Sequence, residues 1–544
     1  MALYANEPFA DSLIKEICKK EPALIYNYAQ DTGSVAGKLI LRNADPMVKA
    51  VVNLTKLPMG LLYFPFLDDL ISGERQTKYL EKIITDEESG TDTISYYKLL
   101  VQTEIKYHRR LIKGDTAVGF FGRNGLKEML KKKALQHFII PINEMHEKAE
   151  NVRMKPVGFL SAVDIYYMLV MGEEDIYTSS YEKSFTRMLQ RMGKKPATDS
   201  LLREIDNDYF KKFVRMAANF NRLDAFLNLM PVETARSLMK DFVGGLEIPD
   251  DLEDATDVAD SYGSINNKTL QADILNYVSG NEQRCAAINN SRGRVIYKVL
   301  KTIFLSADHP DKTDNTEAIG ITPIYSIENK ALQDDSGRII EQVFFYGDGG
   351  KIFSDYINSF SPKDWKVNNT VKEWVEIQSL KKPQILIYAN RPLNANNNLD
   401  DSAQVHLNKF LSSHHLLPSI IIHRGHSYWL PGTMDRMPGY AKIVVLGSCG
   451  GYKDLNQLIE INPDAHIIST KQIGTGLINY NIMQALNRVL LSGETIDWRK
   501  MWNSLNLLFA KQPAYIREAW NDYVPPYKNL GSVFLKAFNK SIEY

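Results

Sequence analysis

The chain has 544 residues, of which 44% are hydrophobic, and its 65 basic residues balance its 65 acidic residues. This balance argues against a polyanionic partner such as nucleic acid, and the composition is typical of a soluble globular protein. A chain of this length exceeds one ordinary core, so two or three domains are expected. No run approaches the roughly 18 apolar residues that a membrane span needs.

Three cysteines, Cys18, Cys285 and Cys449, are too few and too widely spaced for a disulfide framework. At least one thiol is therefore free, which favours a reducing compartment such as the cytoplasm. The first residues lack the basic and apolar segments of a secretory signal. A signal removed earlier would leave a periplasmic or secreted location open.

Helical periodicity extends from the N-terminus to about residue 305. Apolar residues at three- and four-residue spacing predict one amphipathic helix over 210–227 and another over 231–242, the second followed by Gly244. The acidic stretch 249–260 is interpreted as a loop or linker. No repeat of fixed period is found, so an irregular helical scaffold is expected.

The pattern changes after a polar segment at 308–335, which is the expected domain boundary. Beyond it, short runs rich in Ile, Val, Phe or Tyr alternate with helical patterns, which is typical of a mostly parallel sheet covered by helices on both faces. The expected strands are 342–346, 384–388, 419–423, 442–446 and 465–469, and helices are expected at 402–411, at 455–461 and before Gly493.

These patterns predict three regions: a mainly α-helical region over residues 1–310, a linker or first hairpin over 311–334, and an α/β domain over 335–544. The helical region could recognise a substrate, inhibit the site or bind a protein partner.

Two of the expected strands lead directly into residues that can do chemistry. The strand at 419–423 continues into Gly425 and His426, and the next strand ends at Cys449 followed by two glycines. Consecutive parallel strands are usually neighbours, so the two loops should meet at the carboxyl edge of the sheet. An imidazole beside a thiol can accept its proton and later protonate a leaving amine.

The amides of Ser427 and Cys449 are the natural donors to a developing oxyanion, because the glycines after Cys449 allow a tight turn. His423 is the alternative base, although a histidine within a strand is more typical of a packed core. Cys449 could also be a small buried hydrophobe, but its position at a strand end before Gly-Gly favours catalysis.

The order of these motifs resembles the caspase-like clan (clan CD) of cysteine peptidases: an apolar strand with Gly-His, a second apolar strand ending Ser-Cys-Gly-Gly, and then 466–470 ahead of a long helix. The similarity is greatest to its bacterial CHAT and gingipain-type members, and it covers about residues 335 to 500. It implies a cysteine endopeptidase with Cys449 as nucleophile, His426 as base, a thioester intermediate and no metal or organic cofactor. The clan usually has glycine where this chain has Ser427.

Members of this clan bind the substrate residue before the cleaved bond near the end of the first strand and near the strand after the cysteine. The corresponding candidates are Asp348, which could pair with a basic residue, and Lys471, which could pair with an acidic one. Asp348 between glycines is equally typical of a turn, so the preferred charge stays open. The alternative function is a catalytically inactive caspase-like binding scaffold that acts through its helical half.

Overall fold

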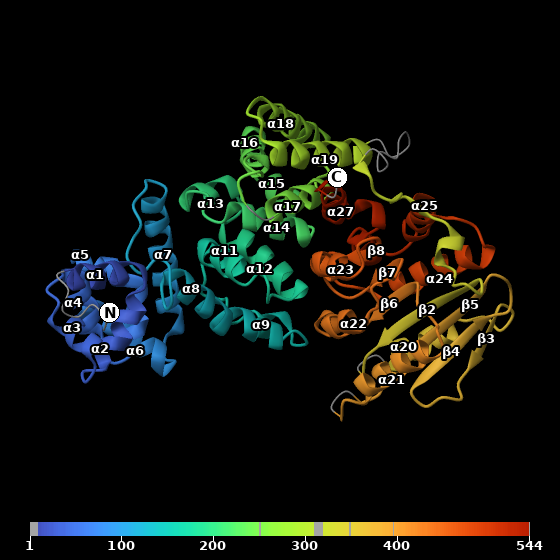
Figure 1. Ribbon diagram of the computed structural model, residues 1–544, viewed down its shortest axis with the longest axis horizontal. Coiled ribbons are helices and arrows are strands. Elements are labelled where there is room, and N and C mark those ends of the chain that lie inside the picture. The colour runs from blue at the N-terminus through green and yellow to red at the C-terminus, as the bar shows by residue number, and fades with distance from the viewer. Residues whose placement is uncertain (1–8, 250–251, 309–318, 348–349, 395–396, 543–544) are drawn as a thin grey trace. The chain divides into compact units, whose positions relative to one another are not determined.

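The computed structural model describes residues 9–249, 252–308, 319–347, 350–394 and 397–542 (Figure 1). The chain forms two compact units, Met1–Phe213 and Val214–Tyr544. The N-terminal region is helical, and the C-terminal domain contains a mixed sheet. This confirms the prediction of a helical region followed by an α/β domain.

The first unit is built from helices, of which α11 packs against α7, α8 and α12. Helix α11 begins with a capping box between Ser161 and Asp164, and residues 163–171 are all buried, so it packs on all sides. The helices are α1 (Ala10–Lys20), α2 (Pro22–Gln30), α3 (Val35–Arg42), α4 (Pro46–Leu54), α5 (Leu67–Ser72), α6 (Thr77–Ser89), α7 (Thr93–Leu111), α8 (Leu126–Ala134), α9 (Ile140–Glu144), α10 (Glu150–Arg153), α11 (Ala162–Met171), α12 (Thr178–Arg191) and α13 (Thr198–Glu204).

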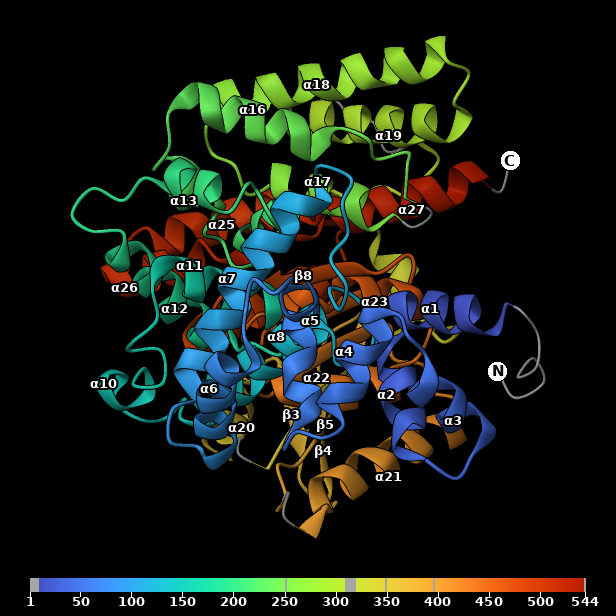
Figure 2. The same cartoon turned by 90° about the vertical axis from the view of Figure 1, so that its left-hand side faces the viewer.

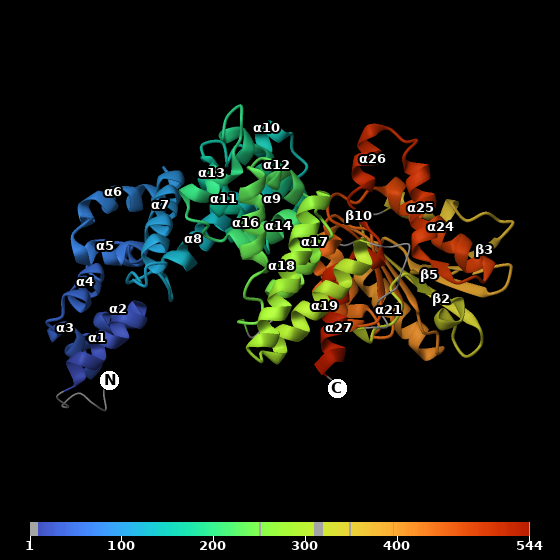
Figure 3. The ribbon, with the colours of Figure 1, turned by 90° about the horizontal axis from the view of Figure 1, so that it is seen from above.

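The second unit begins within α14, which starts at Phe210, and five further helices follow it; of these, α18 and α19 lie side by side (Figures 1 and 2). Further along the chain, α27 packs against α17 and α19 (Figure 3). The helices of this unit are α14 (Phe210–Asn219), α15 (Leu223–Leu227), α16 (Val232–Val243), α17 (Glu253–Tyr262), α18 (Lys268–Ala287), α19 (Ser291–Asp308), α20 (Gly350–Asn358), α21 (Leu399–Ser413), α22 (Leu430–Arg436), α23 (Leu455–Ile461), α24 (Gly476–Ser492), α25 (Trp498–Phe509), α26 (Ala514–Trp520) and α27 (Leu530–Ile542).

Two predictions of secondary structure in the helical region are wrong. The single helix expected over 210–227 is divided into α14 and α15, because Asn221 adopts a left-handed backbone with φ of 51°. The acidic stretch expected to be a loop instead forms most of α17. Glu253 and Asp254 lie in its first turn, where carboxylates favour a helix, and Val258 and Tyr262 are buried on one face.

An eight-stranded sheet with the order β10-β8-β7-β6-β2-β5-β4-β3 forms the core of the C-terminal domain. Strands β2, β5, β6, β7 and β8 are parallel, whereas β4 pairs antiparallel with both β5 and β3, and β10 pairs antiparallel with β8. The strands of this sheet, together with a separate pair, β1 and β9, are β1 (Ser326–Ile327), β2 (Arg338–Phe345), β3 (Trp365–Asn368), β4 (Trp374–Ser379), β5 (Gln384–Asn390), β6 (Ile420–Arg424), β7 (Ile443–Leu446), β8 (His466–Thr470), β9 (Ile496–Asp497) and β10 (Tyr523–Val524).

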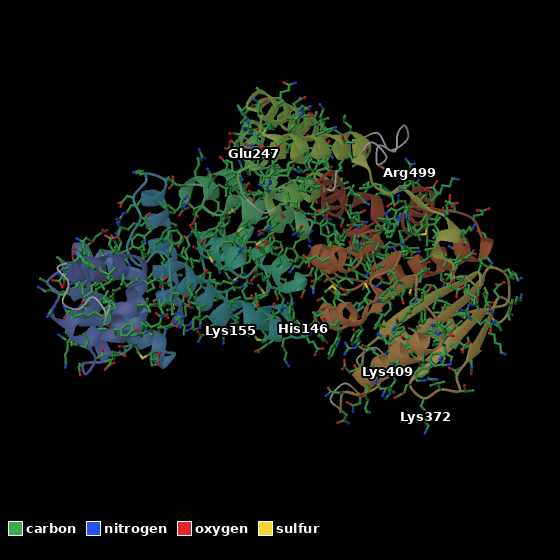
Figure 4. All side chains as sticks on the ribbon, viewed as in Figure 1. His146, Lys155, Glu247, Lys372, Lys409 and Arg499 are labelled. Atoms are coloured by element: carbon green, nitrogen blue, oxygen red, sulfur yellow. The ribbon has the colours of Figure 1, made fainter. Side chains whose placement is uncertain are left out.

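Helices cover both faces of this sheet. Apolar residues of α20, α24, α25 and α26 pack on one face, and those of α21, α22 and α23 pack on the other. On α21, for example, Leu407 and Leu411 are buried while Lys409 faces outward (Figure 4). The five parallel strands coincide with the apolar runs of the sequence, which confirms that these runs form strands. Strands β3, β4 and β10 were not predicted.

Candidate active site

His426 and Cys449 follow neighbouring strands at equivalent positions. Strands β6 and β7 are paired in parallel, with Ile420 opposite Ile443 and His423 opposite Leu446. His426 lies three residues after His423, and Cys449 lies three residues after Leu446. Both residues therefore leave the same carboxyl edge of the sheet, on adjacent loops, as their strand-end positions predict.

Cys449 is partly exposed, whereas Cys18 and Cys285 are both fully buried. Burial raises the pKa of the Cys449 thiol, while a hydrogen bond from the backbone amide of Gly474 lowers it. Burial also raises the pKa of Cys18 to about 12 and that of Cys285 above its usual value. Of the three thiols, only Cys449 combines solvent access with a donor directed at its sulfur.

Gly474 can approach Cys449 only because it has no side chain. A Cβ at this position would overlap the carbonyl oxygen of Gly447, so the loop after β8 packs directly on the backbone of the loop after β7. Gly450, with φ of 66°, supplies the left-handed turn after the cysteine, and its amide donates to the carbonyl of Gln472 over 2.9 Å. The cysteine loop is thus joined to the loop after β8 on both sides of Cys449.

The first turn of α24 also holds the cysteine loop. The amide group of Asn479 donates from Nδ2 to the Gly447 carbonyl over 2.8 Å, and its Oδ1 accepts from the Tyr523 hydroxyl over 3.1 Å. The Tyr523 oxygen in turn accepts from the Thr475 amide over 2.9 Å. These bonds fix the position of the backbone that carries Cys449.

The two predicted oxyanion donors lie at the same edge. Ser427 begins a short 3-10 turn, η7 (Ser427–Trp429), and Cys449 lies in a turn directly after β7. Across the ranges that the structure describes, no backbone carbonyl accepts a hydrogen bond from the amide of Ser427 or of Cys449. An amide without a carbonyl partner can donate to an oxyanion, but the Cys449 amide must first leave the sulfur of its own side chain, to which it donates.

The two candidate bases have different surroundings. His426 is exposed, and its ring stacks on that of Tyr428 with a centroid distance of 5.2 Å and an interplanar angle of 9°. His423 is fully buried, with Nδ1 2.7 Å from the Thr433 hydroxyl and Nε2 3.3 Å from the carbonyl oxygen of His426. His423 therefore supports the loop that carries His426, as expected of a packed strand histidine.

Lys471 is buried at the end of the β8 segment, where its ammonium group donates to the Ala218 carbonyl over 3.0 Å and to the Ser264 hydroxyl. It also lies 4.2 Å from the centroid of the Tyr452 ring, and burial lowers its pKa to about 8. These partners already engage the ammonium, and its role toward a substrate stays a prediction. The other pocket candidate, Asp348, lies outside the described residues.

Arg424 is a polar residue of this edge that the sequence did not single out. It is the last residue of β6, it is only 7% exposed, and among the described residues its Nε has no hydrogen-bond partner. It lines a cavity of about 390 Å³ together with residues of α20 and α24. In the sequence, Arg424 could have been noticed by its position directly before Gly425 and His426. An arginine at such a position is ordinarily expected to be exposed to solvent.

Within the described parts of the chain, no group of three or more His, Cys, Asp or Glu residues could hold a metal ion. No described helix is both long and apolar enough to cross a bilayer.

The chain was compared with protein-family models, with curated proteins and with solved structures, and none of them matches it. The function must therefore be argued from the residues and the geometry of the site.

Proposed function

We propose that this protein is a cysteine endopeptidase of the caspase-like type, with Cys449 as nucleophile and His426 as general base. The observation that carries this proposal is the register of β6 and β7, which gives the two residues equivalent positions after paired strands. The resemblance of the strand-end motifs to the caspase-like clan adds to it. The partial exposure of Cys449 allows a substrate carbonyl to reach the sulfur.

The proposed reaction consumes one water molecule for each peptide bond. His426 accepts the thiol proton as the Cys449 sulfur attacks the carbonyl carbon, and the amides of Ser427 and Cys449 donate to the resulting oxyanion. The C–N bond then breaks, and the imidazolium returns its proton to the leaving amine. Water attacks the thioester with His426 as base, the C–S bond breaks, and the carboxylic product leaves while the thiol regains its proton.

In this proposal the surrounding residues position the reacting groups. Gly474 donates to the sulfur, Asn479 holds the Gly447 carbonyl, and His423 accounts for the placement of the His426 backbone. The imidazole raises the fraction of thiolate during attack, which offsets the effect of burial on the Cys449 thiol.

A cleavage assay on a mixed peptide library tests this proposal. We expect the wild-type protein to generate new termini, Cys449→Ala to generate none, and His426→Ala to be slower by about 10² to 10⁴-fold, as for loss of a general base. Cys285→Ala is the matched control, because Cys285 is buried in α18 and should leave cleavage unchanged.

Cleavage by Cys449→Ala at the wild-type rate would rule out this nucleophile. Absence of cleavage by the wild-type protein across the whole library would instead favour the non-catalytic binding scaffold.

A further inference from the structure

The cavity that Arg424 lines lies where the order of the parallel strands reverses. After β2 the parallel sheet continues with β5 on one side, and β6 lies on the other side of β2 and leads on to β7. In open α/β sheets, ligands bind at the carboxyl ends of the strands at this kind of point. The cavity of about 390 Å³ is bounded there by α20, which follows β2, by Arg424 at the end of β6, and by α24.

Arg424 brings an unneutralised positive charge to this cavity. Among the described residues no carboxylate oxygen lies within 4 Å of its guanidinium group, and its Nε has no hydrogen-bond partner. Burial lowers the pKa of Arg424, but a guanidinium group remains charged in proteins. A buried cation without a partner is costly, so a ligand anion that enters the cavity would relieve this cost.

The buried acid that shares the neighbour Tyr356 with Arg424 does not supply this charge. Glu341, in β2, accepts a hydrogen bond from the Tyr356 hydroxyl over 3.3 Å, and burial raises its pKa to about 8. At neutral pH most of this carboxyl group is therefore protonated. Asp355, which also lines the cavity, is an exposed residue of α20 and forms no ion pair with Arg424.

The rest of the lining suits a short acidic side chain. Leu477, Tyr480 and Met483 of α24 provide apolar surface for methylene groups, while Tyr356 and Arg424 provide polar groups. An arginine can bind both oxygens of one carboxylate, which gives this pairing both strength and a defined geometry.

The cavity and the nucleophile share a neighbour. The phenol of Tyr523 is close enough to both groups that a Cys449 thiolate raises its pKa and Arg424 lowers it. Thr475, whose amide donates to the Tyr523 oxygen, follows Gly474, which donates to the Cys449 sulfur, and precedes the first residue of α24. The cavity lining includes Gly476, which lies only two residues after the amide that donates to the Cys449 sulfur.

We infer that this cavity binds the side chain of an aspartate or glutamate directly before the cleaved bond, with Arg424 as the residue that determines this specificity. This specificity rests on the proposed peptidase function. It gives the charge of the preferred substrate side chain, which the sequence left open.

Fluorogenic peptides that differ only in the residue before the cleaved bond test this inference. For the wild-type protein we expect kcat/KM for Asp to exceed that for Asn by about 10 to 100-fold, because a neutral amide offers one acceptor oxygen and does not neutralise the guanidinium charge. Glu should exceed Gln in the same direction, and Lys should be cleaved most slowly. In Arg424→Gln the rate for Asp should fall to the level of Asn, while Arg424→Lys should retain part of the preference.

Two controls accompany this experiment. Arg338→Gln removes an arginine at the opposite end of the sheet, at the start of β2, where it pairs with Asp334 over 2.8 Å, and should keep the preference for Asp. The rate at which iodoacetamide alkylates Cys449 should be the same in Arg424→Gln as in the wild type, which shows that the variant is folded. If Arg424→Gln does not fold, the ratio of kcat/KM for Asp to kcat/KM for Asn in the wild-type protein still tests the acidic specificity.

The outcomes separate the two proposals. Equal rates for Asp and Asn, or a preference for Lys, would overturn the acidic specificity but would still support the proposed peptidase function. Failure to cleave any of these peptides or the mixed library would overturn both.

Discussion

Glu341 is a fully buried carboxyl group in the centre of β2, and the Tyr356 hydroxyl is the donor that the structure gives it. Burial raises its pKa from the ordinary 4.5 to about 8. In the unfolded chain the same group ionises near its ordinary value. Between these two values the folded protein therefore binds one more proton than the unfolded chain does.

At this residue scale we predict that Glu341 makes the C-terminal domain less stable as the pH rises from about 5 to 8, by at most about 1.4 kcal/mol per pH unit. Glu341→Gln removes the ionisation, so its free energy of unfolding should increase relative to the wild type over the same range. Urea unfolding followed by tryptophan fluorescence measures this, because all six tryptophans lie between Trp365 and Trp520. A difference that is independent of pH would mean that Glu341 is ionised in the folded protein.

At the scale of elements, the loop between β8 and α24 shapes the site as much as the strands that carry His426 and Cys449. Gly474 contacts the backbone of the cysteine loop, and Asn479 bonds to it from the first turns of α24. Neither contact is visible in the sequence, because each joins segments that lie far apart along the chain. The strand-end motifs were predictable because their order and their strands are local features.

Gly474→Ala tests the role of this loop. The added Cβ meets the Gly447 carbonyl, so the loop must move and the hydrogen bond to the Cys449 sulfur should be lost. We expect kcat/KM for a peptide to fall roughly 10²-fold, as for other small displacements of catalytic groups.

Gly280→Ala is the control for this variant, because a Cβ at Gly280, within α18, meets nothing within 4 Å. It should leave activity unchanged and favour the helix by at most about 1 kcal/mol. Wild-type activity in Gly474→Ala would show that the loop does not position the nucleophile.

At the scale of the whole molecule, the helices from α14 to α19 belong to the same compact unit as the sheet. Partly buried polar contacts join them: the Asp260 carboxylate accepts from the Tyr452 hydroxyl over 2.5 Å and from the Gly531 amide over 2.7 Å. Asn221 donates to Asp522 over 2.7 Å. The sequence located the change from helices to strands between α19 and β1, but not these contacts.

The reason for this difference is physical. Periodicity reports which face of an element is apolar, so it predicted the parallel strands and the helices α21, α23 and α24 of the C-terminal domain. Acidic α17 was missed because its buried residues include small ones, such as Ala255 and Ala259, which alternate with acidic residues and weaken the apolar periodicity. Arg424 was missed because its burial depends on α20 and α24, which pack over the end of β6.

The covalent adduct formed with a peptidyl electrophile most directly tests the claim that Cys449 is the nucleophile. The intact protein should gain the mass of one adduct, and peptide mapping should place it on Cys449, since Cys18 and Cys285 are fully buried. Cys449→Ala should gain no mass under the same conditions, while Cys285→Ala should react as the wild type does. An adduct that maps to Cys18 or Cys285, or undiminished labelling of Cys449→Ala, would contradict the assignment.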